Sequence, residues 1–234
     1  MLKFDIVTIF PQIFDSYFNT SIVLRAQKMG KIAIKPWDLR QYSTDNYKSV
    51  DDHPYSGGAG MILKLEQIYL AVEDIKKEIA KDKDKKTRII LFSANGKKFN
   101  QDMAKKWAKY DRLVMICGRY EGVDNRVAEK IADEEISIGE YVLTGGELPA
   151  MVVVDSIARL MPGVIKSDSL ESESFNKVKG QRVLEYPQYT RPEVFITKEG
   201  KKWRVPKVLL SGDHKKVQEW KEGKSKKLSP DIAK

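Results

Sequence analysis

The chain has 234 residues, of which 41% are hydrophobic and 32% are charged, a composition typical of a folded globular protein. No stretch approaches the roughly 18–20 unbroken apolar residues of a membrane span, and the amino terminus lacks the pattern of a secretion signal. With one cysteine and two histidines, a disulfide framework is excluded and zinc-type ligand spacing is absent. We expect a cytoplasmic protein without a membrane anchor.

Basic residues are concentrated toward the carboxyl terminus. Residues 1–165 carry 25 Lys and Arg against 23 Asp and Glu, whereas residues 166–234 carry 17 against 10, a net charge of +7. A basic segment of this size fits a polyanion such as RNA, although a solvated lysine-rich surface has the same composition. We divide the chain into a large domain (1–165), a flexible linker (166–176) and a small domain (177–234).

Predicted strands and helices alternate along the large domain, because apolar runs predict strands and apolar residues at helical spacing predict helices. In chain order, the sequence predicts a strand at Phe4–Phe10, a helix at Ser21–Met29, a strand at Lys31–Pro36, a long loop at Gln41–Gly60, a helix from Leu65, a strand at Arg88–Phe92, a helix at Gln101–Tyr110, a strand at Arg112–Cys117, a helix at Val123–Ala132, a short strand at Ile136–Ile138 and a helix at Gly146–Leu160. The alternation predicts an α/β fold with a mostly parallel sheet and helices on both faces.

Three loops rich in glycine or polar residues follow predicted strands, at Ser93–Gly96, Cys117–Gly122 and Ser137–Ala150. Open α/β sheets bind ligands at the carboxyl ends of their strands, and glycine lets backbone groups approach a flat ligand closely. Neither longer run fits the phosphate-binding loop or the dinucleotide-binding pattern. We therefore expect one flat, polar ligand enclosed by the three loops, and we interpret Cys117 as a buried structural thiol.

Other polar residues leave two interpretations open. The segment Asp51–Met61 is either an irregular turn or a substrate loop whose glycines admit a base or ribose. Arg159 is either a surface residue that extends toward solvent or a cation aimed at developing negative charge. The carboxylates of Asp168, Glu171 and Glu173 in the linker are either solvated or include a general base on a loop that orders over substrate.

Aromatic and basic residues interleave in the last segment of the chain. The aromatic ones are Tyr186, Tyr189, Trp203 and Trp220, and the basic ones are Arg182, Arg191, Lys202, Arg204, Lys215 and Lys216. This pattern suits stacking on bases together with phosphate contacts. A small domain also needs aromatic residues in its core, so we expect Trp203 or Trp220 to be buried. A Lys-rich helix is predicted from about Asp213.

Several of these segments carry a resemblance to a known family. They are Phe4–Pro11, Asp51–Met61, Cys117–Gly122, Ser137–Ala150, Ala158–Val164, Tyr189–Glu193 and Val208–His214. These segments, in this order, span nearly the whole chain. On them, the chain resembles the bacterial tRNA (guanine-37-N1)-methyltransferases of the TrmD family. The resemblance implies a SPOUT-type α/β domain with a deep trefoil knot, a small, mainly helical C-terminal domain, and a homodimer with its sites at the subunit interface.

The resemblance also implies the ligands. In the family the knot binds S-adenosylmethionine in a bent form, and the linker and small domain help to grip tRNA. The cofactor-binding residues would be Leu91, Ser93, Asn95, Gly96, Gly118, Tyr120, Glu121, Gly122, Ser137, Ile138, Gly139, Tyr141, Leu143, Gly145, Gly146 and Pro149. The tRNA-binding residues would be Asp51, Asp52, Gly58, Gly60, Arg191, His214 and Lys215. Members also use Mg²⁺, which Glu121 or Glu173 would help to position, although the sequence itself reveals no metal site.

Methylation of guanine N1 needs a base for the N1 proton and a donor for the charge that grows on O6. By family analogy Arg159 takes the O6 role, and the base is the aspartate of an Asp-Ser-Phe triplet. Here the triplet reads Glu173-Ser174-Phe175, and the preceding linker is shorter. We expect Glu173 to be the base, with Asp168 as the weaker candidate.

Smaller departures concern substrate handling. Ser56 and Ala59 stand where the family tends to have glycine and proline, and Gln188 stands where histidine is common. Two alternative functions stay open. One is a different SPOUT RNA methyltransferase, acting on a ribose 2′-hydroxyl or on another base, and the other is an RNA-binding homologue without activity.

Overall fold

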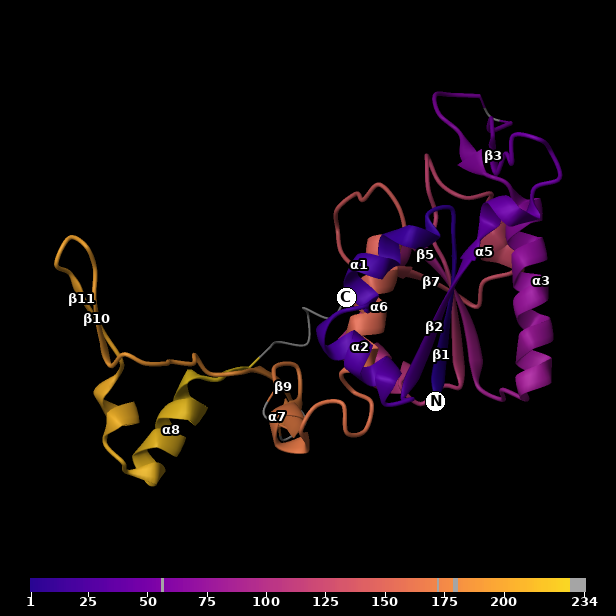
Figure 1. Ribbon diagram of the computed structural model, residues 1–234. Helices are drawn as coiled ribbons and strands as arrows, with labels where there is room; N and C mark the ends of the chain where they lie inside the picture. The colour runs from indigo at the N-terminus through magenta and orange to yellow at the C-terminus, as the bar shows by residue number, and fades with distance from the viewer. Residues whose placement is uncertain (56, 172, 179–180, 228–234) are drawn as a thin grey trace. The chain divides into compact units, whose positions relative to one another are not determined.

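The computed structural model describes residues 1–55, 57–171, 173–178 and 181–227, with the backbone alone at residues 168, 171, 177 and 178. The chain divides into two compact units, Met1–Ile165 and Lys166–Lys234. The first unit contains a five-stranded sheet, whereas the second contains short strands and helices (Figure 1). Within the described ranges, no helix combines the length and apolar character needed to cross a membrane.

The sheet of the first unit is parallel throughout, which confirms the predicted α/β fold. Its strands follow the order β2-β1-β6-β5-β7. Their bounds are β1 (Leu2–Thr8), β2 (Ile32–Asp38), β5 (Thr87–Lys98), β6 (Arg112–Ile116) and β7 (Glu134–Ser137). Strand β6 is buried along its whole length, as expected for a central strand covered on both faces.

Helices cover both faces of the sheet, also as predicted. One face carries α1 (Asp15–Phe18), α2 (Ser21–Lys28), α4 (Gln101–Trp107) and α6 (Glu147–Ala158), and the other carries α3 (Leu65–Asp82) and α5 (Arg126–Lys130) (Figure 1). Each layer encloses its own apolar core, the first around Phe4, Trp107 and Val153 and the second around Ile68 and Val114.

Short elements complete the first unit. They are the 3-10 turns η1 (Pro11–Phe14) and η2 (Leu39–Tyr42) and the antiparallel pair β3 (Asp51–Asp52) and β4 (Ile62–Leu63). The sequence pattern does not predict η1 or α1, because four-residue segments have too few turns for a helical period to appear. Both are held by Phe14 and Phe18, which are buried and whose stacked rings lie 5.2 Å apart.

Strand β5 is longer than predicted, because it continues past Phe92 to Lys98. Ile136 of β7 pairs with both Phe92 and Lys97, so residues 93–96 bulge out of the ladder. Gly96 lies within this bulge, where a Cβ atom would overlap the backbone of Ile136. The predicted loop Ser93–Gly96 is therefore a bulge, and Gly96 serves the close contact between two strands.

The second unit contains, besides its helices, short strands that the sequence did not predict. Its elements are α7 (Ser167–Glu171), β8 (Lys177–Val178), β9 (Gln181–Leu184), β10 (Val194–Ile196), β11 (Lys202–Arg204), η3 (Lys207–Leu210), α8 (His214–Lys224) and β12 (Lys226–Lys227). Strands β12, β9 and β8 pair in that order, and β10 pairs with β11. These strands are two to four residues long. Helix α7 lies within the predicted flexible linker.

Helix α8 begins where a Lys-rich helix was predicted. The Asp213 carboxylate caps its first turn by accepting the backbone N–H groups of Lys215 and Lys216. The expectation of a buried tryptophan was wrong: Trp203 is 63% exposed, and Trp220 is half-buried beside Tyr189. None of the described residues of this unit is fully buried, because a unit of this size encloses little interior.

Candidate functional site

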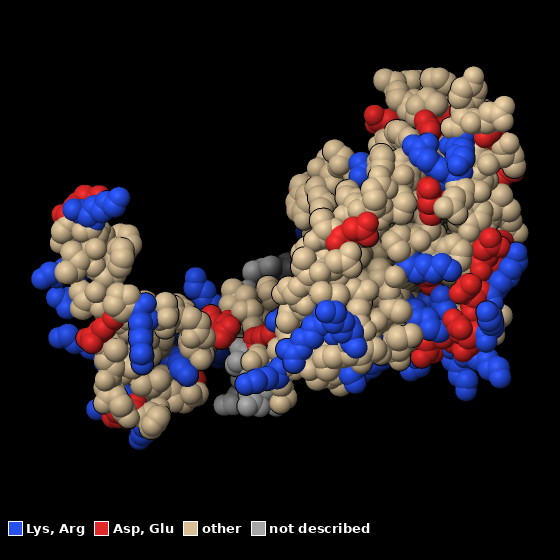
Figure 2. Space-filling view, in the orientation of Figure 1, with Lys and Arg blue, Asp and Glu red and all other residues tan. Residues whose placement is uncertain are grey.

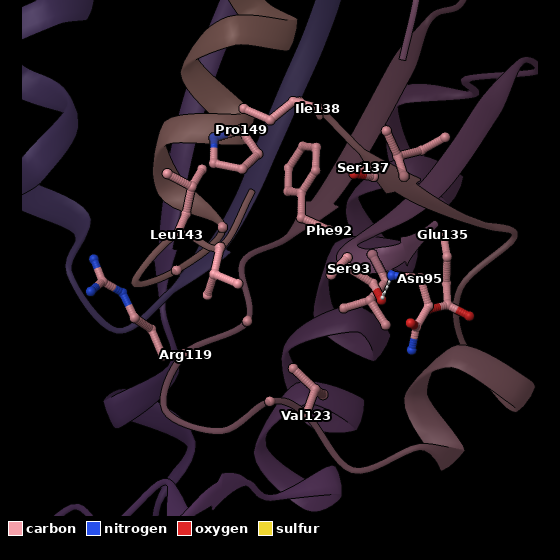
Figure 3. Close-up of a pocket in the computed structure, with 18 of the residues that line it drawn as sticks. Phe92, Ser93, Asn95, Arg119, Val123, Glu135, Ser137, Ile138, Leu143 and Pro149 are labelled. Atoms are coloured by element: carbon pink, nitrogen blue, oxygen red, sulfur yellow. Dashed lines mark hydrogen bonds between the residues drawn. The ribbon is translucent and has the colours of Figure 1, made fainter. Parts of the chain in front are cut away.

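A cavity of about 420 Å³ opens at the carboxyl ends of β5, β6 and β7. The bulge of β5, the loop after β6 and the loop between β7 and α6 line it (Figure 3). Of the residues predicted to bind the cofactor, those in the lining are Leu91, Ser93, Asn95, Gly118, Tyr120, Glu121, Gly122, Ser137, Ile138, Gly139, Tyr141, Leu143, Gly145, Gly146 and Pro149. Gly96 is absent from the lining, because it packs against β7. A cofactor role for these residues stays a prediction.

The lining also contains residues that were not among the predicted cofactor-binding residues. They are Phe92, Ala94, Arg119, Val123, Asn125, Ala128, Glu135, Ile136, Val142 and Thr144. Six of them are apolar positions inside the predicted strands, loops and helices, with no motif to mark them. Arg119 stood inside the glycine run Cys117–Gly122, and its charge within that run was the signal that could have singled it out.

The cavity has an apolar side and a polar side. Figure 3 shows Phe92, Ile138 and Pro149 gathered on one side, whereas Asn95 and Glu135 lie together on the other. The Asn95 backbone N–H donates to Ser93 Oγ at 3.2 Å, which holds the polar turn of the bulge. An apolar slot beside a few fixed polar groups suits a ligand with a flat ring and a charged portion.

Glycines allow the two longer loops to pack against each other. The Gly146 N–H donates to the carbonyl of Gly118 at 2.9 Å, and Arg119 pairs with Gly145 across an antiparallel bridge. A Cβ atom on Gly146 would lie 2.6 Å from Cys117 Cα, and one on Gly145 would overlap the Arg119 side chain. At these two positions the absence of a side chain serves contact between loops, whereas the glycine pattern predicted contact with ligand.

A buried carboxylate lies behind these loops. Glu147, the first residue of α6, is 1% exposed. Its Oε1 accepts the Thr8 hydroxyl at 2.8 Å and its Oε2 accepts Arg119 Nε at 2.8 Å. The Arg119 guanidinium also lies 4.8 Å from the centre of the Phe10 ring. We call Thr8, Phe10, Arg119 and Glu147 the Glu147 cluster; nothing in the sequence pattern indicated it.

Cys117 is a buried free thiol, which confirms its interpretation as a structural residue. Burial, and then the negative charge of Glu147, raise the pKa of Cys117 well above its ordinary value. The thiol therefore stays protonated at neutral pH, and a thiolate nucleophile is disfavoured at this position.

The structure brings part of the predicted substrate loop to the cavity. Asp51 and Asp52 form strand β3, so the segment 41–60 is less irregular than expected. The Glu121 N–H donates to the carbonyl of Met61 at 3.0 Å, and a Cβ atom on Gly60 would overlap the Glu121 side chain. Gly58 has no neighbour within 4 Å of its would-be Cβ, and Ser56 lies outside the described residues.

The remaining predicted residues are divided between the units. Arg159 follows the last residue of α6 as its C-cap and is half-buried. Glu173, Arg191, His214 and Lys215 belong to the second unit. The side chain of Asp168, on helix α7, lies outside the described residues. Across the described part of the chain, His, Cys, Asp and Glu side chains form no group of three or more that could hold a metal ion.

A parallel sheet with a glycine-built cavity at its carboxyl edge, and without a phosphate-binding loop, defines an α/β ligand-binding domain outside the ordinary nucleotide folds. The profile of the family described as "tRNA (Guanine-1)-methyltransferase TrmD" matches residues 2–230. The chain belongs to this family.

Named relatives agree with this assignment. A tRNA (guanine-N(1)-)-methyltransferase of Dictyoglomus turgidum is 49% identical over 222 residues, covering 94% of this chain and 84% of the relative. One from Lachnospira eligens is 45% identical over 236 residues, covering 99% and 94%. The crystal structure of tRNA (m1G37) methyltransferase from Aquifex aeolicus is similar, with a TM-score of 0.73 and 39% identity, covering 94% of this chain and 87% of that one.

Proposed function

We propose that this chain transfers the methyl group of S-adenosylmethionine to N1 of guanine 37 of tRNA, next to the anticodon. Membership of the family supports the reaction. The structural observation that carries the proposal is the cavity at the carboxyl edge of the sheet, walled by the three loops that the sequence predicts to enclose one ligand. We propose further that these loops form the trefoil knot that the resemblance implies.

The cavity fits S-adenosylmethionine in size and chemistry. Its volume of about 420 Å³ lies within the roughly 300–1,000 Å³ of small-molecule sites. The apolar slot of Phe92, Ile138 and Pro149 suits the adenine ring. The carboxylates of Glu121 and Glu135 in the lining favour the positive sulfonium, which supplies the methyl group when the cofactor is bound.

The proton and charge chemistry falls on two residues of the chain. We propose that Glu173 removes the N1 proton and that Arg159 donates to O6 as negative charge grows there. Arg159 directly follows α6, at the end of this 12-residue helix opposite the turn that adjoins the cavity, so about 18 Å of helix separates the two. Glutamate carries its carboxylate one methylene farther than aspartate, and Asp168 remains the second candidate for the base. For Mg²⁺ we propose Glu121 or Glu173, since this ion commonly binds one or two carboxylates and keeps several waters.

We propose that the second unit binds tRNA, through Arg191, His214 and Lys215 and through the hairpin β10–β11. Phe195 and Trp203 pair across this hairpin with their rings 5.7 Å apart, and they are 50% and 63% exposed. Figure 2 shows Lys and Arg side chains spread over the surface of this unit. Exposed aromatic rings beside positive charge suit stacking on bases and contact with phosphates.

We propose a homodimer, with each site completed at the subunit interface, and a cytoplasmic location, where tRNA is modified. Leu148 and Val152 lie one turn apart on α6, and their side chains are 52% and 42% exposed. Leu148 directly precedes Pro149 of the cavity lining. A second copy that covers this apolar stripe would therefore also cover the rim of the cavity. Light scattering at micromolar concentration tests the dimer, and a monomer would contradict it.

The function is tested by methyl transfer from labelled S-adenosylmethionine to two tRNA transcripts that differ only in G or A at position 37. We expect label in the G37 transcript alone, recovered as 1-methylguanosine after digestion. Equal labelling of both transcripts, or recovery of a 2′-O-methyl nucleoside, would indicate another RNA methyltransferase. Absence of label, with tRNA still bound, would indicate the RNA-binding homologue without activity.

A further inference from the structure

We infer that the Glu147 cluster fixes the spacing of the two loops that form the cavity, and that Thr8, Arg119 and Glu147 are positioning residues for S-adenosylmethionine. The inference rests on the proposed function, because it takes the cavity to be the cofactor site. The cluster joins three elements: Thr8 ends β1, Arg119 lies in the loop after β6, and Glu147 begins α6.

The contacts of the cluster form a closed ring. The Thr8 hydroxyl donates to Glu147 and accepts the backbone N–H of Phe10 at 3.0 Å. Glu147 accepts Arg119 Nε, and the Arg119 guanidinium lies over the ring of Phe10. A buried carboxylate is unfavourable unless its oxygens are paired, so Glu147 is satisfied only when all three elements are in register.

Arg119 carries this constraint into the cavity loops. Its Nη1 donates to the carbonyl of Thr144 at 3.3 Å, and its backbone pairs with Gly145. Thr144, Gly145 and Gly146 line the cavity, and so do Gly118 and Tyr120, the chain neighbours of Arg119. Figure 3 shows the Arg119 side chain pointing away from Asn95 and Ser93, as expected of a residue that contacts the neighbouring loop rather than a ligand. The planar guanidinium of arginine suits this role, because its N–H groups point in fixed directions toward the Glu147 carboxylate and the Thr144 carbonyl.

The experiment separates positioning from general stability. We expect Glu147→Gln to raise the dissociation constant for S-adenosylmethionine about tenfold or more, because the charge-assisted bond to Arg119 is lost. In the protein without cofactor, we expect the Gly146 amide, bonded to Gly118, to exchange its hydrogen faster. Arg112→Lys is the matched control, since Arg112 lies in a buried ion-pair cluster at the opposite, amino edge of the sheet. We expect it to lower the unfolding temperature and leave cofactor affinity unchanged.

A second pair of variants keeps the test decisive where Glu147→Gln fails to fold. Thr8→Val removes the hydroxyl at nearly constant volume, and Thr8→Ser keeps it. We expect weaker cofactor binding for the first and near wild-type binding for the second. Unchanged affinity and unchanged Gly146 exchange in Glu147→Gln or Thr8→Val would overturn the inference, as would equal loss of affinity in Arg112→Lys. Absence of cofactor binding by the wild-type chain would instead overturn the proposed function, and Gly146 exchange would still report on the cluster.

Discussion

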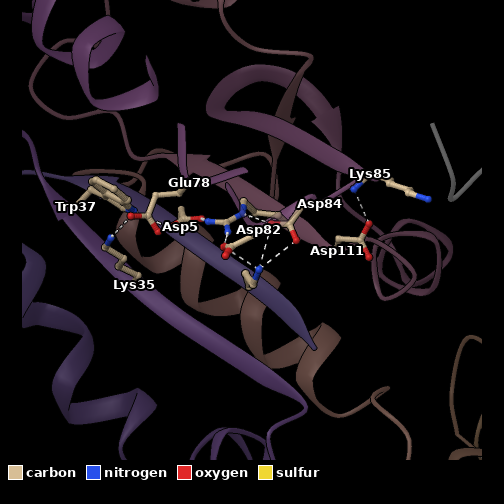
Figure 4. Close-up of polar contacts among 10 residues, drawn as sticks. Asp5, Lys35, Trp37, Glu78, Asp82, Asp84, Lys85 and Asp111 are labelled. Carbon is tan, nitrogen blue, oxygen red and sulfur yellow. Dashed lines mark hydrogen bonds and ion pairs between the residues drawn. The ribbon is translucent and has the colours of Figure 1, made fainter. Parts of the chain in front are cut away.

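Arg112 is the residue whose removal we expect to destabilise the large unit most clearly. It begins β6 and is 2% exposed. Its Nη1 lies 2.6 Å from Asp5, its Nη2 2.6 Å from Asp82 and its Nε 2.7 Å from Asp84. Figure 4 shows these three aspartates gathered around one guanidinium. Lys3 also contacts Asp82 at 2.9 Å and Asp84 at 3.1 Å.

The loss of unfolding free energy in Arg112→Met follows from which partners each aspartate keeps. Asp82 and Asp84 both keep Lys3 as a partner, so neither carboxylate is left without a cation and their contributions are smaller. Asp5 is 1% exposed and keeps the indole N–H of Trp37, at 2.6 Å, but no cation. Leaving a buried charge without its partner costs about 3–5 kcal/mol. For a unit of this size, this loss lowers the unfolding temperature by about 6–20 °C.

The assay is denaturant unfolding of the full chain, followed by circular dichroism, for the wild type, Arg112→Met and the double variant Asp5→Asn/Arg112→Met. We expect the double variant to recover part of the lost stability, because it removes the uncompensated charge. Cofactor affinity stays at the wild-type value in each variant that folds. A loss below about 1 kcal/mol in Arg112→Met, or a double variant less stable than the single one, would refute the reasoning.

Three further predictions concern catalysis, tRNA binding and acid stability. We expect Glu173→Ala and Arg159→Ala each to lower turnover about 10²-fold or more with little change in cofactor affinity; full activity of Glu173→Ala in a single-turnover assay would remove it as the base. Trp203→Ala is expected to raise the Michaelis constant for tRNA several-fold, and Trp203→Tyr to restore the wild-type value. Equal Michaelis constants for Trp203→Ala and the wild type would exclude stacking by Trp203. Backbone N–H groups, that of Lys86 first, lower the pKa of Asp111 below its ordinary 3.8. The stabilisation by Asp111 is therefore present above that value and lost as pH falls through the lowered pKa. In Asp111→Asn we expect the free energy of unfolding to fall less steeply as the pH is lowered in this range, and an unchanged slope would contradict this.

Much of the fold of the large unit could be predicted from local patterns, because strand and helix periods are set by neighbouring residues. The bulge in β5 could not, since it arises where Ile136 of a distant strand pairs with both Phe92 and Lys97. The strands of the small unit were missed for a related reason. Runs of two to four residues, such as Lys202–Arg204, are too short to show a period.

The loops of the candidate site could be predicted, but the groups that hold them could not. Glycine runs at strand ends mark where a chain can approach closely, whatever it approaches. Whether the neighbour is ligand or protein depends on tertiary packing, and at Gly145 and Gly146 the neighbour is protein. Glu147 looked like part of the same run, and its burial against Thr8 depends on residues 139 positions apart.

A buried ion pair between arginine and a carboxylate lies at each edge of the sheet, and the two pairs have different consequences. At the amino edge, Arg112 and Asp5 join β6 to β1 far from the cavity, so we expect changes there to alter the free energy of unfolding alone. At the carboxyl edge, Arg119 and Glu147 join the loop after β6 to α6, and Arg119 also lines the cavity. A change there alters the wall of the site along with the fold. If variants at both edges, matched for loss of stability, reduced cofactor affinity equally, affinity would depend on overall stability and the distinction between the edges would fail.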